Sequence, residues 1–120
     1  MVERPTDTWR AFVEEHPDSA ELYPESMMLR TDEVLAEFEA EVAAFDDPSD
    51  DEVFAAIENV VLALNGVNEE YDGAAYETEE RENLCAYLDA TLTEARIDVA
   101  ALAARRGIGR YEITDAWREW

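Results

Sequence analysis

The fold of this chain depends on residues 53–71, which read VFAAIENVVLALNGVNEEY. Large apolar side chains recur there at alternating steps of four and three residues, a spacing that places them on one face of an α-helix. The positions are Val53, Ile57, Val60, Leu64, Val67 and Tyr71, with Phe54 and Val61 widening the stripe. We therefore predict a central amphipathic helix, which is too short for a long coiled coil.

Helical signals continue on both sides of that stretch. Residues 32–45 carry apolar side chains at three- and four-residue steps, and Ser49 followed by Glu52 predicts a capping box before the central helix. Other helix starts are expected at Thr6 or Asp7, at Thr78 and at Asp98, while Pro24 either starts or breaks a helix. We predict an all-α fold, a single compact domain of five or six helices over residues 1–120. It leaves room for a short extended segment near residues 110–113.

Charge is the strongest signal in the composition. The chain has 31 acidic residues against nine basic ones, a net charge of −22, and all nine basic residues are arginine. Such a surface repels itself, and molar salt, with a Debye length of about 3 Å, screens that repulsion far better than dilute buffer. The composition resembles that of small acidic cytoplasmic proteins of extreme halophiles. This resemblance implies a habitat and no particular activity, and a mesophilic acidic protein is the alternative.

The same charge argues against two classes of partner. Nucleic acids and anionic membranes are bound by clusters of basic side chains, which this chain scarcely has. Residues 1–5 lack the basic start and apolar run of a signal peptide, so we expect a cytoplasmic location. Cys85 is the single cysteine, which excludes an internal disulfide, and its place in an apolar stripe predicts a buried side chain.

Residues 68–79 resemble the calcium loop of EF-hand proteins in outline. The resemblance implies Asn68, Glu70, Asp72 and Glu79 as oxygen ligands for calcium or magnesium around a turn at Gly73. The chain departs from the family pattern, because Asn stands at the first position and the longer Glu at the third. A Glu following Asp-Gly arises readily in so acidic a chain, so the alternative is a plain helix C-cap at Gly73 with no cofactor.

The C-terminal segment differs from the rest in charge. Residues 105–120 hold four arginines and three acids. The order Thr-Asp-x-Trp-Arg-x-aromatic occurs at residues 114–120 and also at residues 6–12. Because tryptophan is energetically valuable at interfaces, we expect a partner surface here. The residues assigned to it are Trp9, Arg110, Trp117 and Trp120. The alternative is that Trp117 and Trp120 anchor the segment to the core.

No constellation for catalysis stands out. Nucleophilic triads and di-iron sites need a histidine with suitably placed partners, and the single histidine, His16, precedes a proline near a helix end. Paired carboxylates carry little information on so acidic a background. The sequence thus favours a non-catalytic helical protein that associates with an unknown protein partner, self-association included. Divalent-cation binding at residues 68–79 and a carboxylate-based hydrolase are the alternatives.

Overall fold

The apolar stripe of residues 53–71 forms the longest helix, α3, which spans Asp50–Glu70. The structure is a computed structural model that describes residues 2–120. The hydroxyl of Ser49 accepts a hydrogen bond from the backbone N–H of Glu52, and the Glu52 carboxylate accepts one from the N–H of Ser49. The predicted capping box is therefore confirmed, and it fixes where α3 begins.

Four further α-helices and two short 3-10 helices complete the chain. In order they are α1 Pro5–Glu15, η1 Pro17–Glu21, α2 Glu25–Ala43, α4 Thr78–Glu94, α5 Val99–Arg105 and η2 Arg110–Glu112. Asp98 caps α5 through a hydrogen bond from the N–H of Ala101, as predicted. No strand occurs within residues 2–120, and the all-α prediction is confirmed. No helix in the same range combines the length and the apolar character needed to cross a membrane.

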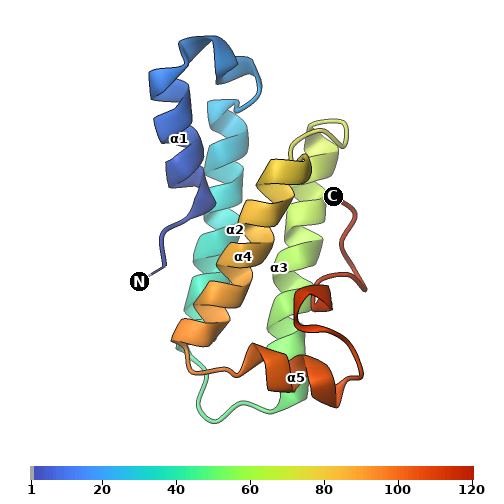
Figure 1. The fold of residues 1–120 in the computed structure, drawn as a ribbon. Helices are drawn as coiled ribbons and strands as arrows, with labels where there is room; N and C mark the ends of the chain where they lie inside the picture. Colours follow the sequence, from blue (N-terminus) through green and yellow to red (C-terminus); the bar gives the residue numbers. More distant parts are fainter. Residues whose placement is uncertain (1) are drawn as a thin grey trace.

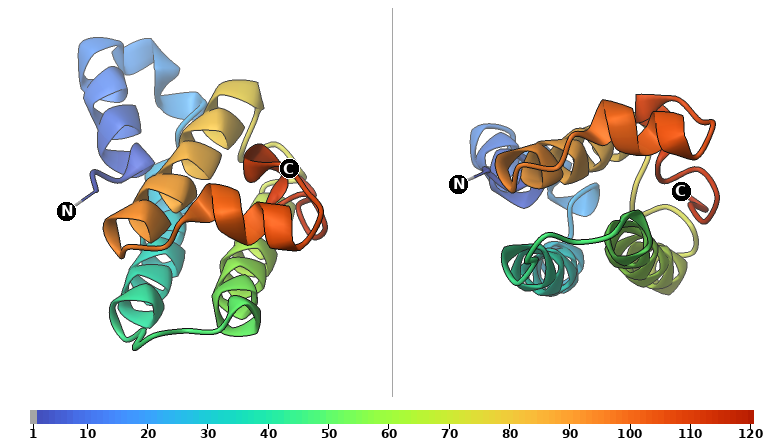
Figure 2. Two further views of the ribbon diagram at one scale, coloured as in Figure 1. Left: turned by 60° about the horizontal axis from the view of Figure 1, so that its bottom comes forward. Right: turned by 90° about the horizontal axis from the view of Figure 1, so that it is seen from below.

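The helices pack in two layers. The view from below in Figure 2 shows α2 and α3 side by side in one layer and α1, α4 and α5 in the other. Figure 1 shows the turn between α1 and α2 and the turn between α3 and α4 at the same end of the bundle. The core between the layers is apolar, and its largest fully buried side chains include Phe38, Met27, Leu35, Ile57 and Leu64.

The start of α2 lies earlier than its apolar spacing predicts. The sequence places a helix at residues 32–45, whereas α2 begins at Glu25 with Pro24 as its N-cap. Of the two roles open to Pro24, it is the helix start that is observed. Met27 and Met28 are almost fully buried, so the extra turns are held by packing that no clean periodicity reveals.

Three local predictions are corrected. Pro5 opens α1 with Arg4 as its N-cap, and the buried Thr6 hydroxyl donates to Asp32 on α2 instead of capping the helix. The N-cap of α4 is Glu77, paired with Glu80 in a capping box, and not Thr78. Residues 110–112 form a 3-10 turn, because Glu112 returns its carboxylate to the N–H of Gly109. An extended segment there is therefore not observed.

Candidate functional site

The arginines are used as internal ties between helices. Seven of the nine form ion pairs with carboxylates, and only Arg81 and Arg96 make none within the part of the chain that the structure describes. Most pairs join two elements. Arg30 ties α2 to Glu70 on α3, and Arg105 ties α5 to Asp50 on α3. Few cations are therefore left to meet an anionic partner.

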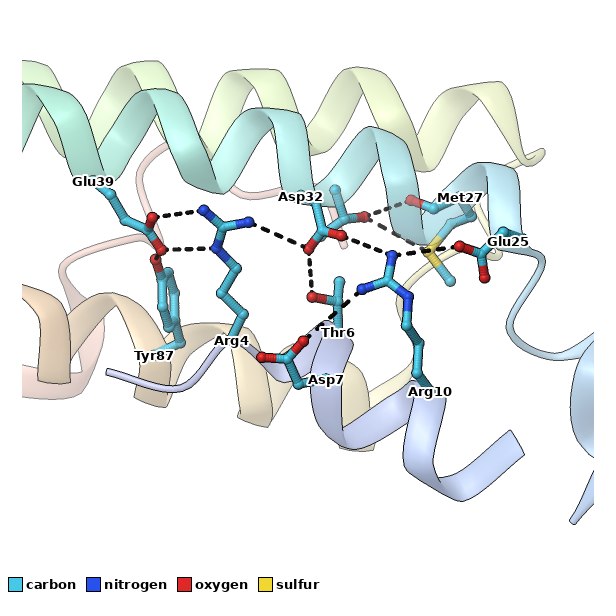
Figure 3. A network of polar contacts seen from close by, with 10 residues as sticks. Arg4, Thr6, Asp7, Arg10, Glu25, Met27, Asp32, Glu39 and Tyr87 are labelled. Atoms are coloured by element: carbon cyan, nitrogen blue, oxygen red, sulfur yellow. Dashed lines mark hydrogen bonds and ion pairs between the residues drawn. The ribbon is translucent and has the colours of Figure 1, made fainter. Parts of the chain in front are cut away.

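The densest of these networks holds α1 against α2 and α4, as Figure 3 shows. Arg4 donates two hydrogen bonds to Glu39 at 2.9 and 2.7 Å, and the hydroxyl of Tyr87 on α4 donates to the same carboxylate. Arg10 donates to Asp32 at 2.7 Å. The hydrogen bonds from Arg4 lower the pKa of Glu39, so this carboxylate is held in its charged form.

The tryptophans assigned to a partner surface divide into two groups. Trp9 and Trp120 are buried in the core, where Trp9 stacks on Tyr23 with ring centroids 5.8 Å apart. Trp117 is half-buried and lines a surface hollow with Phe54. Arg110 is exposed and forms a two-point ion pair with Asp89 at 2.8 and 2.7 Å. The structure does not bring these four residues together on one surface.

A buried amide clasps the C-terminal segment to α3. The side chain of Asn65 donates to the carbonyl of Trp117 at 2.8 Å and accepts from the N–H of Glu119 at 3.0 Å. Arg118 adds hydrogen bonds to Thr114 and to the carbonyl of Trp120. The amide of Asn65 thus joins the segment to α3, and the bonds of Arg118 hold the segment's own turn, which supports its role as an anchor to the core.

Loop 68–79 is organised by its first residue. Asn68 is buried, and its side-chain oxygen accepts from the N–H groups of Ala75 and Tyr76 at 3.0 and 3.3 Å. Its carbonyl accepts from the N–H of Gly73, which has the positive φ of a helix C-cap. An uncharged amide suits this buried position better than the aspartate of the EF-hand pattern, because burying a charge is costly.

The other three predicted cation ligands, Glu70, Asp72 and Glu79, do not share one environment. Glu70 pairs with Arg30, and Asp72 and Glu79 are exposed. Within residues 2–120, no group of three acidic, histidine or cysteine side chains has the arrangement of a metal site. As the loop stands, the oxygen of Asn68 is already engaged, so direct coordination by it requires the loop to rearrange.

The same loop forms one wall of a pocket of about 600 Å³, which we call the acid-rimmed pocket. The opposite wall comes from the end of α1, the turn η1 and the start of α2, at the shared end of the bundle in Figure 1. Phe12 and Leu22 line it, and these two large apolar side chains are 43% and 69% exposed to solvent. The other apolar lining residues are Tyr23, Pro24, Met27, Tyr71, Ala74 and Ala75.

Four carboxylates stand around this pocket. Glu21 comes from η1, Glu77 caps α4, and Glu79 and Glu80 lie in the first turn of α4. None of the four takes part in an ion pair within residues 2–120. Burial, with the charges of Glu80 and Glu79, raises the pKa of Tyr23 to about 12. The pocket therefore combines an apolar floor with an uncompensated negative rim.

A second hollow, of about 520 Å³, lies between α4 and η2. Arg110 and the exposed Tyr111 line it together with Cys85, whose thiol pKa is raised by burial. Its charged groups include Arg110 and Asp89, which already neutralise each other. Glu82 also lines this hollow and takes part in no ion pair within residues 2–120. The hollow lacks the exposed large aliphatic side chain and the group of four carboxylates that distinguish the acid-rimmed pocket.

Comparison with protein-family models, with curated proteins and with solved structures found no match for this chain. Sequence reasoning missed Phe12 and Leu22 as site residues, because Phe12 is one apolar residue of a short helix and Leu22 lies between two helices. The signal that was available is that Leu22-Tyr23-Pro24 is apolar yet lies in a turn between two helices.

Proposed function

We propose that this protein is a non-catalytic association module that binds a protein partner through the acid-rimmed pocket. The observation that carries the proposal is the exposure of Phe12 and Leu22 on one wall of this hollow, facing the loop at residues 74–80. Exposed apolar side chains gathered at a concave surface are typical of protein interaction sites. Tyr23 stacks on the buried Trp9 and meets the Phe12 ring edge-on, and these contacts support a preformed surface.

The C-terminal segment with Trp117 and Trp120 is a less suitable partner surface than the acid-rimmed pocket. Trp120 is buried, and the backbone around Trp117 is held by Asn65. Engaging Trp120 with a partner would require the segment to leave α3 and would expose buried residues such as Ile113 and Thr114. The acid-rimmed pocket needs no such rearrangement.

A carboxylate-based hydrolase is supported less. General-acid chemistry needs a carboxyl group whose pKa is raised toward neutrality. Arg4 and Arg105 instead lower the pKa values of Glu39 and Asp50. These carboxylates are structural partners of arginine, and their chemistry is the opposite of that of a proton donor.

Site-specific photo-crosslinking tests the proposal in the cells that make the protein. A photoreactive amino acid at Leu22 is expected to give one discrete covalent adduct, which is lost when Phe12→Ala is added. The matched control is the same group at Leu62, which is 49% exposed on α3 and lies outside the pocket. Equal adducts from both positions, or none from position 22, would contradict the proposal.

A salt requirement is proposed from the charge. Ten of the 31 acidic residues are partners in the arginine ion pairs, so most of the negative surface lacks a bound counter-charge. These ten are Asp7, Glu25, Asp32, Glu33, Glu39, Asp50, Asp51, Glu70, Asp89 and Asp115. We expect the free energy of unfolding by urea to rise as KCl increases to molar concentration, because the salt screens the repulsion. A free energy that is unchanged or falls would contradict a brine-adapted protein.

Divalent-cation binding at residues 68–79 stays a prediction from the EF-hand resemblance. Calorimetric titration with calcium or magnesium in molar KCl tests it directly. Specific binding must disappear in Asp72→Asn, a change that keeps the positive φ accessible at that turn. Heat that persists in this variant would show only diffuse attraction to the acidic surface.

A further inference from the structure

We infer that the acid-rimmed pocket takes a basic segment of another protein, in which arginines or lysines flank one bulky apolar side chain. This inference rests on the proposed function and names the partner class for the same site. It is supported by charge complementarity around an apolar floor. The basic residues of the segment would pair with the carboxylates of the rim, and its apolar side chain would pack on the floor.

The carboxylates of the rim favour a positively charged ligand. Glu21, Glu77 and Glu79 are exposed and unpaired, whereas Asp32, Glu39 and Asp89 elsewhere each have an arginine at 2.7 Å. The chain therefore places its few cations at helix contacts and leaves this rim without one. Arg81 follows Glu77 by one helical turn on α4 and makes no ion pair with the rim. A cation bound here relieves the mutual repulsion of these carboxylates.

The apolar floor favours a bulky apolar side chain of the partner. Phe12, Leu22 and Tyr23 approach from one wall, and Ala74 and Ala75 from the other. A hollow of about 600 Å³ falls in the size range of ordinary ligand pockets and admits a large side chain. Interfaces obtain most of their affinity from such a central apolar anchor surrounded by a polar rim.

A second copy of this chain is a poor occupant. Each copy carries a net charge of −22, so approach of two rims brings like charges together. Seven of its nine arginines already form ion pairs within the fold. Arg81 lies in the first turn of α4 and Arg96 lies just after the end of that helix, so the two are fifteen residues apart. Among residues 2–120, no exposed segment therefore offers two free cations beside an apolar side chain. The basic partner must be a different protein.

The experiment uses the full chain and three synthetic peptides. The first peptide carries two arginines on each side of a Leu-Phe pair, the second replaces the arginines with glutamine, and the third replaces Leu-Phe with Ser-Ser. Fluorescence anisotropy of labelled peptides gives the dissociation constants in about 0.2 M and in molar KCl. In about 0.2 M salt the first peptide is expected to bind at least about tenfold more tightly than either of the others.

Two pairs of variants locate the binding. Glu21→Gln with Glu79→Gln removes two rim charges, and its control, Asp46→Asn with Asp47→Asn, removes two charges from the α2–α3 loop at the other end of the bundle. The rim pair is expected to weaken the basic peptide several-fold and the control to leave it nearly unchanged. Phe12→Ala with Leu22→Ala should weaken it at least about tenfold, whereas the exposed Leu29→Ala with Leu62→Ala should not.

Each other outcome decides something different. If the arginine and glutamine peptides bind equally and Phe12→Ala with Leu22→Ala abolishes both, the partner class is wrong and the association site stands. If both charge variants weaken the basic peptide equally, the attraction belongs to the whole acidic surface and the inference fails. If none of the three peptides binds, the inference fails, and the photo-crosslink at Leu22 decides independently whether the proposed function fails with it.

Discussion

Residues 6–12 and residues 114–120 share the order Thr-Asp-x-Trp-Arg-x-aromatic, and both fold into a helical turn with a buried threonine. In each turn the aspartate pairs with the arginine three residues later, at 3.9 Å for Asp7 and Arg10 and 2.8 Å for Asp115 and Arg118. The burial of the aromatic residues is reversed. Trp9 is buried and Phe12 exposed in the first, whereas Trp117 is half-exposed and Trp120 buried in the second.

The reversal comes from what each turn packs against. The first turn belongs to a helix of eleven residues tied to α2 by Arg4 and Arg10, so its outer face, with Phe12, remains free. The second turn belongs to the C-terminal segment, whose backbone is hydrogen-bonded to α3 through the side-chain amide of Asn65. A local motif thus fixes the turn and its ion pair, and the tertiary surroundings decide which aromatic residue can meet a partner.

Truncating the aromatic residues gives the largest expected difference. Trp9→Ala and Trp120→Ala should each lower the free energy of unfolding by about 3–5 kcal/mol, because each empties a core site. Phe12→Ala should cost less than about 1 kcal/mol, since nearly half of that side chain is already in water. Urea unfolding in molar KCl measures all three. A Phe12→Ala cost equal to that of Trp9→Ala would contradict the reversal.

Removing the clasp tests why the second turn lies flat. Asn65→Ala deletes two hydrogen bonds to the backbone of residues 117 and 119, and should lower the free energy of unfolding by about 1–3 kcal/mol. Hydrogen exchange of the Glu119 amide should accelerate strongly while amides of α1 stay protected. The control is Asn59→Ala, whose exposed side chain makes a single 3.3 Å bond to Glu41. Equal effects from the two variants would rule out a specific clasp.

Acid should loosen the first turn before the second. Because Arg4 lowers the pKa of Glu39, the folded state binds the proton less tightly than the unfolded state. This contribution to stability is present at neutral pH and is lost as pH falls from about 5 through the lowered pKa of Glu39. The expected loss is about 1 kcal/mol, and Glu39→Gln should flatten the slope in that range. The NMR signal of the Trp9 indole should shift with pH before that of Trp120, and the reverse order would contradict the prediction.

The smallest contrast concerns the two buried indole N–H groups. The Trp9 Nε1 donates to Asn83 at 3.1 Å, whereas the Trp120 Nε1 is buried without a partner among the described residues. Trp9→Phe should therefore cost up to about 1 kcal/mol more than Trp120→Phe, since only the first loses a hydrogen bond. Urea unfolding of the two variants compares them directly. A larger cost at Trp120 would mean that its indole N–H has a partner after all.

The fold was largely predictable because its signals are local. The apolar stripe of α3, the capping box at Ser49 and the cap at Asp98 each depend on residues within a few positions of one another. The early start of α2 was missed because Met27 and Met28 are held by tertiary packing and not by a regular period. Residues 110–112 form a 3-10 turn through a side chain of Glu112 that no strand or helix pattern anticipates.

The candidate site was predictable only in part. The loop at residues 68–79 was singled out as unusual, and it does form one wall of the pocket, but through Ala74, Ala75 and the glutamates near the α4 N-terminus. The opposite wall lies about fifty residues away in the sequence. Only the packing of α1 and α2 against α4 brings Leu22 near that loop, and no spacing rule in one sequence encodes such a meeting.

The most direct test of where this protein meets a partner is a map of backbone amide shifts in the isotope-labelled full chain as the arginine-flanked Leu-Phe peptide is added. We expect shifts concentrated at residues 12, 21–23 and 74–80, on both walls of the acid-rimmed pocket. Amides of residues 110–120 should stay in place. Shifts gathered at Trp117 and its neighbours, with residues 12 and 22 unmoved, would contradict it.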